Sequence, residues 1–186
     1  MITVHVSLKG LSPILLHNPA GMGGNGKVGK GRIPTPEEEA AAGCYWMEDK
    51  SSLAIPSANI LRCFTKAGAQ FRIKMGAAKT TMAKVIPSAV SIEPIEYVPF
   101  DTKEYSIDTR RAVVQKQGIL RSRPKLNPWT LKFDLLVIDE DIPRDLIPAL
   151  RLVVEDAGRR VGLGDFRIEK TGPFGKFEVE SWEVEQ

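Results

Sequence analysis

Apolar and polar side chains alternate along residues 2–9, where Ile2, Val4, Val6 and Leu8 are separated by polar residues. A period of two places the apolar side chains on one face of an extended chain and the polar side chains on the other. Residues 2–9 are therefore predicted to form a strand with one buried face and one exposed face.

Two stretches in the first half of the chain carry helix signals. Thr35 is suited to cap a helix that begins at Pro36, contains three glutamates near its positive end, and extends to about Gly43. Ser57 is suited to cap a second helix, which carries an apolar stripe and is expected to end at Gly68.

The second half contains the clearest strand and the clearest helix. Residues 129–139 place alternate apolar side chains on one face, which predicts a strand. Residues 143–157 have an apolar stripe at helical spacing, and Pro148 shifts the expected helix start toward Asp145. Gly158 is expected to end this helix.

The remaining segments are less regular. Glycines dominate residues 21–31, which argues against a helix or strand there and indicates a mobile basic loop. Residues 71–84 are small and basic, and residues 85–100 contain three prolines, which predicts an extended edge or loop segment. Residues 111–123 are typical of a hairpin arm with a polar tip, and a last strand is expected from residue 176 onward.

The expected order is a strand, a helix pair, an insertion, a strand, a helix and a final strand. Helices grouped against a mostly antiparallel sheet make an α+β domain. The β-α-β-β-α-β ferredoxin-like scheme, with helices on one face of the sheet, fits this order with the fewest assumptions. We expect one domain over residues 1–186, with a basic insertion and a β-arm at about 69–125.

Composition narrows the class of protein. The chain is 42% hydrophobic and 26% charged, which excludes a wholly disordered chain. Cys44 and Cys63 are not in a C-x-x-C pair, so neither a disulfide scaffold nor a cysteine zinc site is expected. We expect no metal and no cofactor. The sequence has no apolar run of about 18 residues and no signal-peptide pattern, so a cytoplasmic location is expected.

The net charge of +3 conceals strong segregation. Residues 27–32 carry +3, residues 62–84 carry six bases and no acid, and residues 105–132 carry seven bases against one acid. These stretches together carry +15, so the rest of the chain carries −12. Such partition favours a polyanion as partner. The alternative is a solvated surface whose basic stretches point in different directions.

One motif imitates a phosphate-binding loop. Gly21 and Lys27 have the spacing of a P-loop, but Val28 occupies the position of the hydroxyl that contacts Mg²⁺. Pro34 and further glycines follow instead of the helix that should face phosphate. A flexible basic loop along a phosphate backbone explains these residues better than nucleotide hydrolysis.

Few residues offer catalytic chemistry. His5 and His17 are the only histidines, and a metal-free nuclease can use a histidine as general base or acid. We interpret both as structural or surface residues. The acidic residues 139–141 have the composition of a divalent-ion site, but capping of the next helix is the favoured interpretation.

Two basic elements have chemistry suited to a nucleic acid. The arm is flanked by arginines and a lysine, which form strong contacts to phosphate. Residues 162–177 contain four glycines, whose backbone N–H groups can face an anion. A tight structural turn is the alternative for this second element.

Two segments resemble a known family. Ile55-Pro56-Ser57-Ala58-Asn59-Ile60-Leu61-Arg62 resembles a helix-opening element of the CRISPR-associated RAMP superfamily, and residues 162–177 resemble its glycine-rich loop. The resemblance implies an RRM-like, ferredoxin-type fold that binds CRISPR RNA. It is strongest to the single-RRM backbone subunits, which polymerise along the RNA. The chain end is also similar to proteins of phages and prophages.

We therefore predict a non-catalytic protein that contacts the sugar–phosphate backbone of single-stranded RNA. It is expected to be a RAMP-like subunit that assembles along the RNA. Self-association or other ribonucleoprotein subunits are the expected protein partners, and the acidic surface of one copy is expected to complement the basic surface of the next. The predicted binding residues are Lys27, Lys30, Arg32, Arg62, Lys66, Arg72, Lys74, Lys79, Lys84, Arg110, Arg111, Lys116, Arg121, Arg123, Lys125, Arg159, Arg160, Gly162, Gly164, Arg167 and Lys176.

Three alternatives stay open at this point. The first is a phage accessory protein of recombination or replication that coats single-stranded DNA. The second is a RAMP-type endoribonuclease, and the third is a module whose basic face binds an acidic protein.

Overall fold

The computed structural model describes residues 1–23, 34–114, 117–138 and 145–185. Its main sheet has four antiparallel strands in the order β11-β1-β10-β6. The bounds of these strands are Ile2–Gly10 (β1), Val90–Glu93 (β6), Thr130–Val137 (β10) and Phe177–Glu185 (β11).

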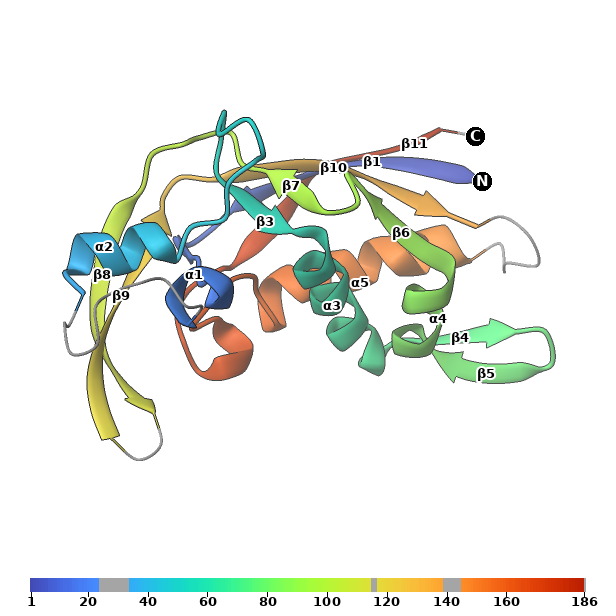
Figure 1. Ribbon diagram of the computed structural model, residues 1–186. Helices are drawn as coiled ribbons and strands as arrows, with labels where there is room; N and C mark the ends of the chain where they lie inside the picture. The colour runs from blue at the N-terminus through green and yellow to red at the C-terminus, as the bar shows by residue number, and fades with distance from the viewer. Residues whose placement is uncertain (24–33, 115–116, 139–144, 186) are drawn as a thin grey trace.

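Two long helices cover one face of this sheet (Figure 1). Helix α3 (Ser57–Ala67) lies between β1 and β6 in the sequence, and α5 (Leu146–Arg160) lies between β10 and β11. The main elements thus run β1-α3-β6-β10-α5-β11, with the two central strands β1 and β10 adjacent. This order confirms the predicted α+β class and the ferredoxin-like arrangement.

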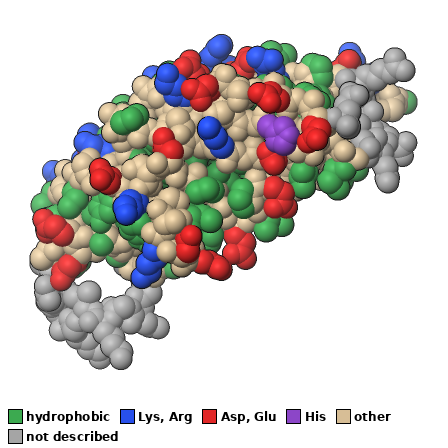
Figure 2. All heavy atoms as spheres, turned by 90° about the horizontal axis from the view of Figure 1, so that it is seen from above, with side chains coloured by type: hydrophobic (Ala, Val, Ile, Leu, Met, Phe, Trp, Pro, Cys, Tyr) green, Lys and Arg blue, Asp and Glu red, His purple; other side chains and the backbone are tan. Residues whose placement is uncertain are grey.

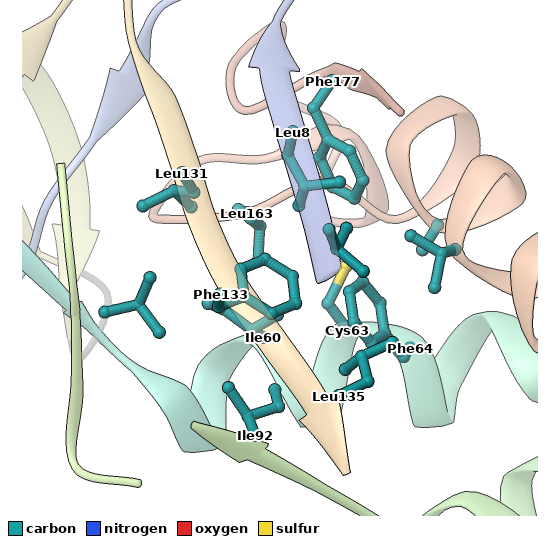
Figure 3. Close-up of a cluster of buried hydrophobic side chains, with 14 of the residues drawn as sticks. Leu8, Ile60, Cys63, Phe64, Ile92, Leu131, Phe133, Leu135, Leu163 and Phe177 are labelled. Atoms are coloured by element: carbon teal, nitrogen blue, oxygen red, sulfur yellow. The ribbon is translucent and has the colours of Figure 1, made fainter. Parts of the chain in front are cut away.

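The core lies between the sheet and these helices. Val4 and Leu8 of β1 and Phe133 of β10 are buried, as the alternation along both strands predicts. Phe64 of α3 packs against Phe133, with ring centroids 6.3 Å apart (Figure 3). Burying a large apolar side chain stabilises a fold by about 1.5–3 kcal/mol, so this face holds the helices to the sheet.

Smaller sheets surround the main sheet. Strands β8 (Ser106–Val114) and β9 (Gln117–Leu126) form the predicted arm, and β2 (Ile14–Leu15) pairs with β9. Strand β3 (Ala54–Pro56) pairs with β7 (Tyr97–Pro99). The arm and the segments around it project at one end of the molecule (Figure 1).

A short helix and a separate hairpin lie outside these sheets. Helix α2 (Pro36–Ala42) begins at Thr35, whose side chain accepts a hydrogen bond from the Glu38 backbone while the Glu38 side chain accepts one from the Thr35 backbone. This capping box confirms the predicted helix start. Strands β4 (Arg72–Met75) and β5 (Ala78–Thr81) form a separate hairpin.

The structure corrects the expectation for residues 85–100. Helix α4 (Met82–Ala89) occupies the first part, although Pro87 lies inside it. Met82, Val85, Ile86 and Ala89 are buried at helical spacing, and this apolar stripe outweighs the signal from the proline. The next residues form β6, which is an edge strand as predicted.

Three local predictions are wrong. Ser57 is the first residue of α3 rather than its cap, and its hydroxyl donates to the Ile95 carbonyl instead. Gly158 lies inside α5, where it allows close contact with Phe177 of β11. Helix α1 (Pro19–Gly23) extends into the start of the stretch 21–31, which was expected to lack regular structure. The two remaining short elements are 3-10 turns, η1 (Gly68–Gln70) and η2 (Ile168–Lys170).

Membrane insertion by a helix has no support in the part of the chain that is described, since no helix there has the length and hydropathy to cross a bilayer.

A pair of glycine substitutions tests how tightly the turn after α5 is packed. Gly175 and Gly76 both have positive φ, 74° and 59°. A Cβ on Gly175 would lie 1.8 Å from the Leu163 carbonyl oxygen, whereas a Cβ on Gly76 meets no atom within 4 Å. Gly76→Ala is expected to lose about 1 kcal/mol of unfolding free energy from strain, and Gly175→Ala about 1–3 kcal/mol more. Urea denaturation measures both, and equal losses would contradict the packing.

Candidate nucleic-acid interface

A cavity of about 290 Å³ opens where the end of β2, helix α3 and the turn after α5 meet. Arg62 and Lys66 of α3 and Arg167 of the turn line this cavity. Asp165 is the one carboxylate among its lining residues. The lining therefore carries an excess of positive charge, as a site for an anion requires.

Helical periodicity explains why α3 contributes several polar groups to one side. Asn59, Arg62 and Lys66 are three and seven residues apart, which places them on one stripe of the helix. Ile60 and Phe64 lie on the stripe that is buried in the core. Because the apolar stripe faces the sheet, the polar stripe faces the cavity.

Cys63 connects α3 to the turn. Its Sγ donates a hydrogen bond to the Gly162 carbonyl oxygen at 3.3 Å. Burial raises the pKa of the Cys63 thiol to about 12, so the thiol stays protonated at neutral pH. Cys63 is accordingly a packing residue and not a nucleophile.

The three lining cations differ in how far they are neutralised. Glu169 pairs with both Lys66 and Arg167, and its Oε2 lies 2.8 Å from Arg167 Nη2. The hydrogen bond from Lys66 is the main cause that lowers the pKa of Glu169, and Arg167 adds to it. Arg62 is exposed and has no carboxylate partner in the described parts of the chain, so its charge is available to a ligand.

His17 lies beside the cations at the end of β2. Burial is the main cause that lowers the pKa of His17 below its ordinary value of 6.5, so its imidazole is neutral at neutral pH. Its Nδ1 is shielded from solvent and has no hydrogen-bond partner among the described residues, while the Tyr45 hydroxyl donates to the His17 backbone oxygen at 3.0 Å.

Three of the four glycine N–H groups expected to face an anion are already engaged. The N–H of Gly162 donates to Ala157, that of Gly172 to Arg167, and that of Gly175 to Pro13. These three donors serve the fold and are not available to an anion. Gly162 and Gly164 still line the cavity, and both have positive φ, so they shape it through their backbone.

Arginines of the arm are mostly engaged in ion pairs. Arg110 Nε lies 2.6 Å from Asp108 Oδ1, and its guanidinium stacks 4.9 Å from the centroid of the Phe174 ring. Arg121 Nη1 lies 2.9 Å from Glu39 Oε1. Each of these contacts removes part of the positive charge that was assigned to the arm.

Arg123, also in the arm, is close to the cavity. Its Nε lies 2.5 Å from Asp165 Oδ2, and its side chain is 14% exposed. This contact links the arm to the glycine-rich turn. Arg111 and Lys125 have no ion pair with a described residue, so no carboxylate of the described chain offsets their positive charge.

A second group of predicted residues lies far from the arm. Arg72, Lys74 and Lys79 are exposed on the β4-β5 hairpin, and Lys84 is exposed on α4. Figure 1 shows this hairpin and the arm at opposite ends of the molecule. Folding therefore does not gather all the predicted cations into one cluster.

Other predicted residues have separate surroundings. Arg160 pairs with Asp156 at 2.6 Å within α5, and Arg159 and Lys176 are exposed. Lys27, Lys30, Arg32, Lys116 and the acidic residues 139–141 lie outside the described residues. Within the described ranges, no group of three or more His, Cys, Asp or Glu side chains is arranged to hold a metal ion.

The sequence did not point to several residues of the cavity. Tyr45 belongs to no recognisable motif. Only its contact with the His17 backbone in the folded chain shows that it lies beside the cavity. Asn59 lay within the resembling segment, and its spacing from Arg62 was the signal that could have identified it. Glu169 could not be identified from the sequence, because its role depends on its contacts with Lys66 and Arg167 in the folded chain.

The open face of the main sheet has the opposite charge. Strand register places Glu93, Asp134, Glu178, Glu180, Glu183 and Glu185 on the face that carries His5, away from the helices. Lys9 and Lys132 share this face. Figure 2 shows acidic side chains around a histidine on this side of the molecule. We call it the acidic sheet face.

Opposite shifts of the two histidines provide a direct test of both surroundings. Hydrogen bonds to Asp134 and Glu185 raise the pKa of His5, whereas burial lowers that of His17. Proton NMR titration of the imidazoles should give one midpoint above 6.5 and one below it, assigned with His5→Gln and His17→Gln. Because the folded pKa of His17 is depressed, its contribution to stability should be lost as pH falls below about 6.5. The contribution of His5 should be lost as pH rises through its raised pKa. Two NMR midpoints that both lie above pH 6.5, or both below it, would contradict these environments.

Comparisons with known proteins bear on the fold. No family model matches the chain, and no curated protein matches its sequence. Among solved structures, it is similar to a chain in the cryo-EM structure of the Type III-B Cmr-β complex bound to cognate target RNA. The TM-score is 0.60 and the identity 12%, with coverage of 98% of this chain and 60% of that chain. The similarity shows a shared fold, and this chain spans about 60% of the length of that neighbour.

Proposed function

We propose that the protein is a non-catalytic RNA-binding subunit of a CRISPR-associated ribonucleoprotein complex. It contacts single-stranded RNA mainly through the sugar–phosphate backbone, and the cavity lined by Arg62, Lys66 and Arg167 is the centre of the contact surface. The neighbour of the same fold belongs to a complex with RNA, which supports the same class of ligand here.

One observation carries this proposal. The two segments that resemble the RAMP superfamily, residues 55–62 and 162–177, are about a hundred positions apart in sequence, yet residues from both line the same cavity. Cys63, which follows the first segment directly, donates a hydrogen bond to the Gly162 carbonyl oxygen in the second. A resemblance in two distant segments that converge on one cationic cavity supports a shared binding site more strongly than either segment alone.

Charge favours the cavity over the open sheet face as the place of contact. A phosphate chain gains from each unpaired cation that it meets, and it is repelled by carboxylates. Arg62 supplies such a cation at the cavity, and Arg111 and Lys125 supply others on the arm. The acidic sheet face has six carboxylates against two lysines.

The state of the side chains at the cavity supports binding without cleavage. Hydrolysis of RNA without a metal needs one group to take a proton and another to give one. Arginine does not lose its proton in proteins, and Lys66 is hydrogen-bonded to Glu169. His17 is the one imidazole that lines the cavity, burial lowers its pKa, and its Nδ1 is shielded from solvent.

Substitution of Arg62 tests the proposed function. Arg62→Ala should weaken binding of a short, labelled oligouridine by about tenfold, because one charge-assisted phosphate contact contributes about 1.5 kcal/mol. The slope of log K against log salt should fall by about 0.7, as expected for one single-strand phosphate contact. Fluorescence anisotropy over a range of salt concentrations measures both quantities.

The matched control is Lys132→Ala, which removes one exposed cation from the acidic sheet face. It should leave the affinity unchanged, and RNA recovered after incubation should be full length. Equal effects of the two substitutions, or tighter binding of a DNA strand of the same sequence, would contradict RNA binding at the cavity. Cleavage by the wild type that is lost in His17→Ala would contradict the non-catalytic assignment.

A further inference from the structure

The carboxylate of Glu169 is shared between two of the cations that line the cavity. Its Oε1 accepts a hydrogen bond from Lys66 Nζ, and its Oε2 accepts two from Arg167, at 3.1 Å from Nε and 2.8 Å from Nη2. Lys66 belongs to α3, whereas Arg167 and Glu169 belong to the turn after α5. One carboxylate thereby joins two cations, although 103 positions separate Lys66 from Glu169 in the sequence.

Backbone hydrogen bonds hold the segment around Glu169 in place. The Glu169 N–H donates to the Val161 carbonyl oxygen at the end of α5, at 3.1 Å, and the Gly172 N–H donates to the Arg167 carbonyl oxygen at 3.0 Å. Helix α5 packs beside α3, which carries Lys66 (Figure 1). The fold therefore sets the position of the carboxylate before any ligand is present.

Both cations keep N–H donors that the protein does not use. An arginine carries five N–H donors and a lysine carries three. Among the described residues, Arg167 donates two hydrogen bonds to Glu169 and one to the Gly164 carbonyl oxygen, and Lys66 donates one to Glu169. Donors of both cations therefore remain for a ligand while the contacts with Glu169 persist.

The carboxylate does not compete with a ligand for the cavity. Lys66 and Arg167 line the cavity, whereas Glu169 does not. The side chains of Lys66, Glu169 and Arg167 are 31%, 29% and 23% exposed, so salt screens their contacts less than those of fully exposed ion pairs. A phosphate group that enters the cavity can contact both cations without displacing Glu169.

Prior ordering of the two cations favours binding. Free lysine and arginine side chains have high conformational entropy, and a ligand that orders them loses affinity through that entropy. Glu169 restricts Lys66 and Arg167 before a ligand arrives, and its negative charge offsets the repulsion between them. The hydrogen bond from Lys66, with a further contribution from Arg167, lowers the pKa of Glu169 and keeps it ionised at neutral pH.

We propose that Glu169 is a positioning residue, which holds Lys66 and Arg167 together as a preformed site for one phosphate group of RNA. This role rests on the proposed RNA binding at the cavity. Glu169 acts through the two cations and does not touch the ligand. Arg62 has no ion pair with Glu169, so its phosphate contact is independent of this site.

The direction of one mutational effect distinguishes positioning from charge repulsion. Glu169→Gln removes a negative charge close to the site of a polyanion, so charge alone predicts tighter binding of RNA. The positioning role predicts the opposite result, a loss of about fivefold in affinity for labelled oligouridine, because Lys66 and Arg167 lose the acceptor that orders them. Fluorescence anisotropy at one salt concentration measures the affinity.

Combined variants show whether Glu169 acts through the two cations. When Lys66→Ala and Arg167→Ala are both present, addition of Glu169→Gln should no longer weaken binding. When Arg62→Ala is present instead, addition of Glu169→Gln should still weaken binding about fivefold, because the two phosphate contacts are separate.

The matched control is Glu155→Gln on α5. Glu155 pairs with Arg151 at 3.2 Å, and neither residue lines the cavity, so the affinity for oligouridine should stay unchanged. A measurement without RNA follows the cations directly. Proton exchange measured by NMR should be slow at Arg167 Nε–H in the wild type and in Glu155→Gln, and faster in Glu169→Gln. Far-UV circular dichroism confirms that each variant is folded.

Three results would overturn the positioning role. Unchanged or tighter binding by Glu169→Gln, while Arg62→Ala still weakens binding, overturns it and leaves the proposed RNA binding intact. A loss of affinity that persists in the absence of both Lys66 and Arg167 also overturns it, because Glu169 would then act on the fold as a whole. A wild type that does not bind oligouridine overturns the proposed function and the positioning role together.

Discussion

The candidate interface depends on the close approach of the turn after α5 to the segment that follows β1. The N–H of Asp165 donates to Leu15, and the N–H of Gly175 donates to Pro13. A Cβ on Gly164 would lie 2.4 Å from the Leu15 carbonyl oxygen, so this approach requires a residue without a side chain. Once the backbones meet, Arg167 lies beside Arg62 and Lys66 at one cavity.

The same fold separates charges of opposite sign. Alternation along β1, β10 and β11 directs apolar side chains toward the helices, and the carboxylates of β10 and β11 point toward solvent. Cations of α3, the arm and the turn after α5 then lie on other sides of the molecule. Cationic and anionic side chains are thus directed to different places on the folded chain.

Sequence patterns predicted most of the architecture because the main elements have strong local signals. These signals depend only on residues that are close in sequence. They are the alternation in β1 and β10, the Thr35 cap and the apolar stripe of α5. Helix α4 was missed because three prolines dominated the local signal, while the buried spacing of Met82 and Ile86 is satisfied only by tertiary packing.

The sequence shows where each candidate cation lies in the chain, but it predicts less well which of them are paired with a carboxylate after folding. Arg121 meets Glu39 and Arg123 meets Asp165, although these partners are distant in sequence. The glycine-rich turn was expected to offer N–H groups, but the carbonyl oxygens of Ala157, Arg167 and Pro13 accept those of Gly162, Gly172 and Gly175. Net charge along a sequence therefore overstates the positive charge that a ligand meets after folding.

Ultraviolet cross-linking of bound oligouridine, followed by mass spectrometry of the attached peptides, tests the central claim most directly. The nucleic acid should attach to peptides that contain residues 45, 55–66 and 161–167, which surround the cavity. Peptides from β1, β10 and the outer part of β11 should carry little or no cross-linked nucleotide. Cross-links confined to those strands would place RNA on the acidic sheet face and contradict the account.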